Sequence, residues 1–180
     1  MIAILRLVLL ALILSQYADA QTFGTNEGTS RFLGKNTYED VKARNTKVFA
    51  SLEADGGEVS ITINMKDFYF ANALMQKSFG EDYLEIAKYP SAFFRGRISK
   101  TVNFGKQGNY DVTVEGRITL HGISKPLAFV GSIEVQNRKV IFEGTFKITS
   151  ADFKIDAPKL AFQKMFESVT ISNYFELEAQ

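Results

Sequence analysis

Several segments of the chain alternate strictly between apolar and polar residues, which is the two-residue period of a strand with one buried face. In the clearest of them, Val59, Ile61 and Ile63 share one face and the residues between them are polar. We predict about eight strands, at about residues 29–35, 47–54, 58–65, 91–99, 109–121, 126–136, 138–149 and 168–178. This pattern predicts an all-β, antiparallel barrel whose interior is either just filled or holds one small ligand.

Four of the predicted strands carry a glycine at the centre of their apolar face. Each glycine has an apolar residue two positions before it and another two positions after it. The four are Gly96, Gly116, Gly131 and Gly144. Because glycine weakens a strand, four at equivalent places need a physical cause. Inward glycines let a closing sheet bend sharply, and they also leave room for a ligand, so we assign them to curvature and to a cavity.

Alternation also identifies the side chains expected inside the barrel, which are the predicted ligand contacts. They are Phe94, Ile98, Val112, Val114, Ile118, Leu120, Leu127, Phe129, Ile133, Phe142, Phe146 and Ile148. An apolar interior without a catalytic motif beside it predicts a protein that holds an apolar or amphiphilic small molecule. The alternative is a structural, stress-related module in which these side chains simply fill the core and an apolar patch is exposed.

Two short helices interrupt the strand pattern. Residues 72–79 have an apolar side, and Gly80 is the expected helix stop. The second helix covers about residues 158–167 and is broadly apolar. We expect both to close or line the ends of the barrel, where Met75 and Met165 would be adaptable ligand contacts. Simple packing is the alternative role for both helices.

The first twenty residues have the features of an export signal. Residues 2–14 are nearly all apolar, and Ala18-Asp19-Ala20 supplies a small-x-small cleavage site, which predicts a mature start at Gln21. The apolar run is shorter than the roughly 20 residues that a spanning helix needs. We therefore expect a signal peptide at 1–20, one barrel domain at 21–180, and a periplasmic or secreted protein without a stable membrane anchor.

The composition narrows the chemistry. There are no cysteines, which excludes disulfides, thiol catalysis and a lipoprotein anchor. The 21 basic and 20 acidic side chains are scattered, and the net charge of +1 provides no electrostatic case for nucleic acid as a partner. The sequence predicts no metal and no cofactor, although a bound lipid is compatible with it. A homodimer is also compatible with the sequence.

His121 is the only histidine and falls at a predicted turn, after the strand at 109–121. A lone histidine without a surrounding motif indicates a structural residue, and we predict no catalytic residues. The alternative is a barrel enzyme in which His121 works with a nearby carboxylate, such as Glu81, Asp82 or Asp152.

Three blocks of the sequence resemble the YceI-like family. The first is Glu-Asp-Tyr-Leu-Glu-Ile-Ala-Lys-Tyr-Pro at residues 81–90, followed by Phe-Phe-Arg-Gly at 93–96. The second is residues 114–126, which end in Leu-His-Gly-Ile-Ser-Lys-Pro. The third is Phe-Lys-Ile-Thr-Ser-Ala-Asp-Phe at 146–153. With the strands before them, these blocks extend the resemblance over about residues 45–178.

The resemblance implies a lipocalin-like extended barrel, exported to the bacterial periplasm or beyond. It implies binding of a long polyisoprenoid, quinone or fatty-acid-like lipid inside the barrel, and we expect the polar head near the mouth. The resemblance implies no catalytic role for His121 or Lys125, which belong to a turn motif of the family. Residues 21–45 lack the usual opening of the family, an aromatic–Ile–Asp segment and a His-Ser-x-Val-x-Phe strand. Since that region helps line the cavity in relatives, we expect a shorter channel here.

Overall fold

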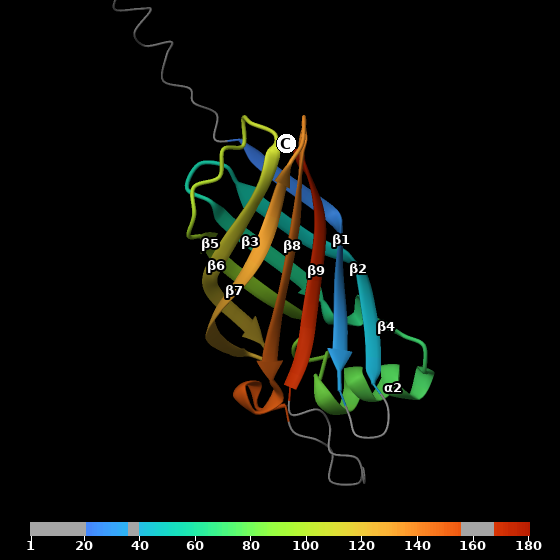
Figure 1. Cartoon of the computed structure of the whole chain (residues 1–180). Helices are drawn as coiled ribbons and strands as arrows, with labels where there is room; N and C mark the ends of the chain where they lie inside the picture. The colour runs from blue at the N-terminus through green and yellow to red at the C-terminus, as the bar shows by residue number, and fades with distance from the viewer. Residues whose placement is uncertain (1–20, 36–39, 156–167) are drawn as a thin grey trace, which may run out of the picture.

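The computed structural model describes residues 21–35, 40–155 and 168–180, and its strands close into a barrel (Figure 1). Eight long strands form the wall, and β4 is a two-residue strand. Their bounds are β1 Thr22–Gly34, β2 Val41–Glu53, β3 Glu58–Asn64, β4 Tyr69–Phe70, β5 Ser91–Ile98, β6 Gly108–Leu120, β7 Ile123–Val135, β8 Lys139–Thr149 and β9 Ser168–Ala179.

The strands follow the order β1-β9-β8-β7-β6-β5-β3-β2, and the pairing of β1 with β2 closes the sheet on itself. Every pairing is antiparallel. The short β4 pairs with the start of β2, where Ala43 lies opposite Phe70. The prediction of an antiparallel barrel of about eight strands, made from alternation, is therefore confirmed.

The first two strands begin earlier than expected. We predicted them at 29–35 and 47–54, whereas β1 begins at Thr22 and β2 at Val41. The register between β1 and β2 shifts on both sides of Gly28. Such an irregularity places successive residues out of the two-residue period, so the alternation that marks a strand is interrupted there.

The helical segments gather at one end of the barrel, called here the α2 end, opposite the C terminus (Figure 1). Helix α2 (Ala73–Ser78) begins after Asn72, whose Oδ1 accepts hydrogen bonds from the amides of Leu74 and Met75. The chain then continues into a single π-helical turn, η3 (Phe79–Tyr83). Two 3-10 turns are also present, η2 (Met65–Asp67) and η4 (Ser150–Phe153). No helix in the described ranges has the length and apolar character needed to cross a bilayer.

The expectation that the first helix stops at Gly80 is wrong, because η3 runs through this residue. A Cβ added to Gly80 would lie 3.0 Å from the Cδ1 of Ile86, so the glycine makes room for a packed side chain instead of ending a helix. The helix predicted at about residues 158–167 lies outside the described residues.

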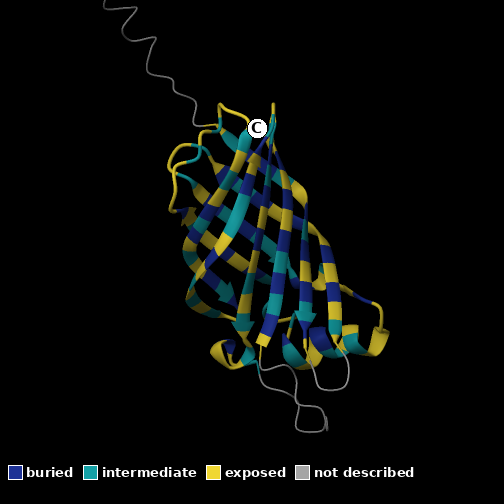
Figure 2. Ribbon diagram, viewed as in Figure 1, coloured by how far each residue is buried: buried dark blue, intermediate teal, exposed yellow. Residues whose placement is uncertain are grey.

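The barrel is densely filled away from the α2 end. The rings of Phe142 and Phe175 stack with centroids 5.9 Å apart, and Val112, Ile133 and Val140 around them are almost completely buried. Figure 2 shows buried and exposed residues alternating along the long strands. The hydrophobic core therefore occupies this part of the interior, and any cavity has to lie nearer to α2.

The four strand glycines form two facing pairs, Gly96 with Gly116 and Gly131 with Gly144. A Cβ on Gly116 would lie 2.3 Å from the carbonyl oxygen of Arg95, and one on Gly131 would lie 2.5 Å from that of Glu143. These contacts show backbones in close approach, as a sharply bent sheet requires.

Aromatic rings fill the space beside the other two strand glycines. A Cβ on Gly96 would lie 2.5 Å from the carbonyl oxygen of Glu115 and 2.6 Å from the ring of Phe94, and one on Gly144 would lie 2.6 Å from the ring of Phe129. The volume that these glycines leave is thus taken by phenylalanine side chains and, at Gly96, by the neighbouring backbone as well. The curvature explanation accounts for the glycines in this structure, and the space they leave is not empty.

Candidate ligand cavity

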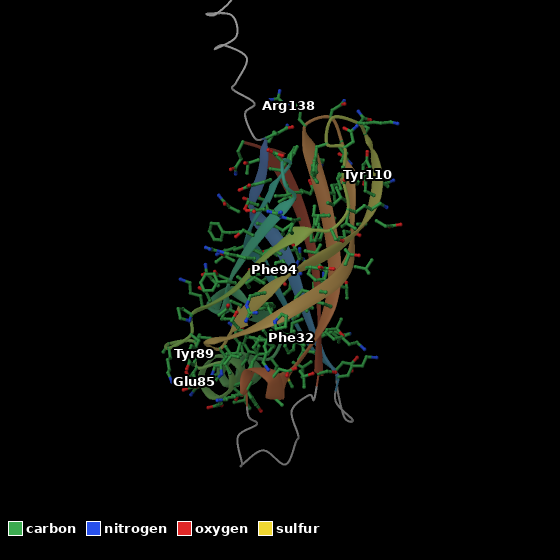
Figure 3. All side chains as sticks on the ribbon, turned by 90° about the vertical axis from the view of Figure 1, so that its left-hand side faces the viewer. Phe32, Glu85, Tyr89, Phe94, Tyr110 and Arg138 are labelled. Carbon is green, nitrogen blue, oxygen red and sulfur yellow. The ribbon has the colours of Figure 1, made fainter. Side chains whose placement is uncertain are left out.

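A cavity of about 90 Å³ lies inside the barrel near the α2 end. Six strands contribute to its wall: β1, β3, β5, β6, β8 and β9. At the α2 end, Phe79 packs against Phe32, Phe68 and Phe70, with ring centroids 4.7–6.1 Å apart within this group. Figure 3 shows Phe32 inside the same part of the barrel. The η3 turn, which carries Phe79, therefore covers the end of the cavity.

The strand register defines how deep the cavity reaches. In the row nearest the α2 end, Gly34, Val169 and Ile148 lie opposite one another on β1, β9 and β8. The next row is Phe32, Ile171 and Phe146, and the third is Ser30, Asn173 and Gly144. The cavity touches residues of all three rows but neither member of the Phe142–Phe175 stack beyond them. The row of Ser30 is therefore the floor of the cavity.

Nine of the twelve predicted contacts belong to the buried hydrophobic cluster, and the other three, Leu127, Phe146 and Ile148, are partly buried and pack against it. Ile118, Leu120, Phe146 and Ile148 line the cavity. The other eight pack in the core: Phe94, Ile98, Val112, Val114, Leu127, Phe129, Ile133 and Phe142. None of the glycines Gly96, Gly116, Gly131 and Gly144 lines the cavity. Alternation predicts which side chains point inward, whereas the cavity depends on where the core stops being filled.

Most of the residues that line the cavity are not among the ligand contacts predicted from the sequence. Ile63, Val169 and Ile171 lie on the apolar faces of the strands predicted at 58–65 and 168–178, so the alternation of apolar and polar residues is a sufficient signal for them. Tyr83 and Leu84 come from the irregular segment after α2, where no periodicity indicates which side chains turn inward.

Only three of the seventeen lining residues carry a hydroxyl group, namely Ser30, Tyr83 and Ser150. Ser30 is on the floor, while Tyr83 and Ser150 belong to η3 and η4 near the α2 end. Burial, and after it the carboxylate of Asp82, raise the pKa of the Tyr83 phenol above its ordinary value. The phenol therefore stays neutral and keeps its proton. The cavity is thus apolar along its length, with neutral polar groups at its two ends.

His121 connects three loops around the α2 end of the cavity. Its Nδ1 lies 3.0 Å from the carbonyl oxygen of Phe153, and its Nε2 lies 2.9 Å from Oε2 of Glu85. A carbonyl oxygen only accepts, so Nδ1 carries a proton and donates it to Phe153. The ring of Tyr89 meets the imidazole edge-on with centroids 4.4 Å apart. Figure 3 shows Glu85 and Tyr89 together beside the α2 end.

The backbone around His121 is strained. Glu85, His121 and Lys154 have φ values of +45°, +51° and +51°, and they are the only non-glycine residues with positive φ in the described ranges. This conformation costs an L-residue roughly 1–2 kcal/mol. Each of the three is next in sequence to a residue of the cavity wall, respectively Leu84, Leu120 and Ile155. The contacts of His121 therefore hold strained loops in the positions that shape the cavity.

The geometry meets one of the two requirements of the enzyme hypothesis. His121 has a carboxylate partner, which is Glu85 and not one of the three named examples, but His121 is not part of the cavity lining. Asp152 instead pairs with Lys125, at 3.6 Å. Across the described ranges, no group of three or more His, Cys, Asp or Glu side chains is arranged to hold a metal ion.

Comparison with known proteins finds one family. The model of the YceI-like domain matches residues 21–180. A UPF0312 protein of Pseudomonas syringae pv. tomato is 25% identical over 129 residues, which cover 68% of this chain and 65% of that protein. A UPF0312 protein of Pseudomonas putida is 24% identical over 142 residues, covering 75% and 70%. The first of these alignments thus spans slightly less than two thirds of the relative.

Solved structures share the fold. A polyisoprenoid binding domain from Saccharophagus degradans superposes with a TM-score of 0.75 at 15% identity, covering 89% of this chain and 99% of that domain. BcnA of Burkholderia cenocepacia gives 0.69 at 16% identity, with 83% and 95% covered. The YceI protein of Campylobacter jejuni gives 0.64 at 17% identity, with 81% and 88% covered. At these identities the likeness shows the fold alone.

Proposed function

The chain belongs to the YceI-like family, and from this premise we propose that it is an exported protein that holds a long-chain amphiphilic lipid inside its barrel. The lipid would be a polyisoprenoid, a quinone or a similar molecule. Export rests on the leader-like residues 1–20, and the chemical class of the ligand rests on the polyisoprenoid binding domain that shares the fold.

The observation that carries this proposal is the apolar cavity at the α2 end. Fourteen of its seventeen lining residues have no hydroxyl, amide or charged group. An apolar wall with a few polar groups is the usual composition of a small-molecule site. Because neither a metal-ligand cluster nor a cavity-facing histidine accompanies it among the described residues, binding accounts for this interior better than catalysis does.

The cavity has to widen to accept such a ligand. Its volume is about 90 Å³, whereas ligand pockets are typically about 300–1,000 Å³. The closed strand ladder resists widening, since every long strand is hydrogen-bonded on both sides. The cover is easier to displace on its α2 side, because no residue of α2 is buried, whereas η3 is held by the buried ring of Phe79. We therefore propose that the ligand enters at the α2 end.

Lipid extraction tests the proposal directly. The full chain is expressed in a bacterium together with its leader, and the exported product is purified without detergent. Mass spectrometry of its organic extract is expected to show one long-chain species at roughly one molecule per protein. An extract without lipid, together with failure of the lipid-free protein to bind a fluorescent polyisoprenoid, would contradict the proposal.

A matched pair of variants links the ligand to this cavity. Ala92 is buried and lines the cavity, so Ala92→Phe is expected to fill it and remove the bound lipid. Val130 is 69% exposed on β7 and is not part of the lining, so Val130→Phe is the control and should retain the lipid. Circular dichroism spectra of both variants should match that of the wild-type protein, which verifies that they have folded. Equal lipid content in the two would place the ligand elsewhere.

A further inference from the structure

Three polar side chains are buried in the described part of the chain, and they lie in one row across three strands. They are Asn45, Ser30 and Asn173, with 0%, 0% and 5% exposure. Ser30 on β1 is opposite Asn45 on β2 and opposite Asn173 on β9. Burying a polar group has a free-energy cost, so each member of the row calls for a physical reason.

Asn45 has a structural reason. Its Nδ2 donates to the carbonyl oxygen of Asn64 at 3.0 Å, and its Oδ1 accepts from the amide of Lys47 at 2.8 Å. Both partners are backbone groups, and Asn45 satisfies the hydrogen bond of each. This side chain therefore satisfies the backbone where β2 departs from regular alternation.

The hydrogen bond between Ser30 and Asn173 joins two side chains and satisfies no backbone group. The Oγ of Ser30 donates to Oδ1 of Asn173 at 2.7 Å. Backbone pairing already joins β1 and β9 through the residues on either side. Replacing both partners of such a hydrogen bond by apolar groups of similar shape is generally close to neutral for stability. Folding alone therefore does not require this polar pair.

The position of the pair suggests contact with a ligand. Ser30 lies on the floor of the cavity, in the deepest row that the cavity reaches. Its hydroxyl proton is used by Asn173, but the oxygen keeps lone pairs that can accept a hydrogen bond. Asn173 is not part of the cavity lining, so its role is to accept the Ser30 proton and orient the hydroxyl, and the Ser30 oxygen is the polar atom next to the cavity.

We propose that Ser30, oriented by Asn173, forms a subsite for an uncharged polar head group that bears a hydroxyl. The ligand then lies with its head on the floor of the cavity and its apolar chain directed toward the α2 end. This inference rests on the proposed function and reverses the expectation that the head stays near the mouth.

The same geometry disfavours a charged head. No charged side chain is buried in the described part of the chain. A phosphate or carboxylate placed on the floor would therefore lack a counter-ion, and burying an unpaired charge is costly. The subsite thus selects an alcohol or a phenol over a fatty acid or a phosphorylated isoprenoid.

The test compares ligands that share one chain. Geranylgeraniol, geranylgeranyl phosphate and the hydrocarbon with the same chain compete with a fluorescent apolar dye for the full-length mature protein. One additional hydrogen bond corresponds to an affinity gain of up to about tenfold. The alcohol is expected to bind about tenfold more tightly than the hydrocarbon, and also more tightly than the phosphate.

Two double variants locate the preference. Ser30→Ala with Asn173→Leu removes both polar partners and should abolish the preference while hydrocarbon binding persists. The control is Thr145→Val with Ser172→Ala, because these residues form an exposed hydroxyl pair at 3.1 Å on neighbouring strands of the wall. The control should keep the preference unchanged.

A direct measurement avoids dependence on the variants. The side-chain amide signals of Asn173 in the wild-type protein should shift in NMR spectra on addition of the alcohol and much less with the hydrocarbon. Equal affinities for alcohol and hydrocarbon, or an unchanged Asn173 signal, would overturn the head-group subsite and leave lipid binding standing. If none of the three ligands binds, the proposed function fails together with the subsite.

Discussion

The Nε2 atom of His121 lies 2.9 Å from Oε2 of Glu85, although the two residues are 36 positions apart in the sequence. The contact joins the turn between β6 and β7 to the segment that follows η3. Within the described ranges, no other side-chain hydrogen bond connects residues 73–89 to strands β5–β9. This contact therefore fixes the cover of the cavity to its wall.

The strain at Glu85 leads to a first prediction. Glu85→Ala loses the contact with His121 but keeps φ at +45°, whereas Glu85→Gly loses the same contact and relieves the strain. Glycine should therefore be more stable than alanine here by about 1 kcal/mol. Urea unfolding of the two variants measures the difference. Equal stabilities would show that this backbone conformation carries no strain.

A second prediction concerns the facing glycines. Gly116→Ala would bring a Cβ to 2.3 Å from a backbone oxygen, so a strand must move. Overpacking of this kind typically costs about 1–3 kcal/mol, and we expect the upper part of that range. Gly105→Ala is the control, since its nearest contact would be a side-chain oxygen at 3.4 Å. Thermal unfolding should separate the two clearly, and similar midpoints would contradict close backbone approach as the role of Gly116.

Much of the fold could be predicted because alternation is a local property of the sequence. The strand at 58–65 shows this well: the pattern gave both its extent and its buried face, and β3 covers Glu58–Asn64. The start of β1 was missed because the irregular register around Gly28 interrupts the alternation. The family resemblance also followed from local blocks, and the match over residues 21–180 agrees with it.

The details of the site depend on contacts between distant residues, which a single sequence does not reveal. The space beside Gly144 is filled by Phe129, from the neighbouring strand. The partner of His121 is Glu85, which was not among the carboxylates that we considered for it. No sequence signal distinguishes Ser30, a single small residue in the strand predicted at 29–35. Its importance emerges only when the register places it opposite Asn173, at the floor of the cavity.

A third prediction concerns pH and the outer surface. Hydrogen bonds from Lys139 and then from Tyr174 lower the pKa of Glu176 below its ordinary value. A lowered pKa means that this contact stabilises the fold above the ordinary pH range of glutamate titration. The stabilisation is lost as the pH falls through the lowered value, and it is small because the group is exposed. Tyr174→Phe should therefore raise the pKa of Glu176, as measured by carboxyl NMR titration. An unchanged titration would mean that Tyr174 does not bond Glu176 in solution.

The last prediction connects the His121 contact to ligand exchange. A ligand larger than about 90 Å³ can enter only if the cavity widens, and Glu85 ties the segment after η3 to His121. His121→Ala removes the hydrogen bonds to Glu85 and Phe153, so it should destabilise the fold by about 1–3 kcal/mol. It should also speed release of a bound fluorescent polyisoprenoid severalfold, as followed by stopped-flow transfer to acceptor vesicles. Lys125→Ala is the matched control, because it breaks only the exposed pair between the start of β7 and Asp152 of η4 and should change neither quantity much. If His121→Ala lowers stability but leaves the release rate at the wild-type value, the ligand leaves by another route and the α2 end is not the mouth.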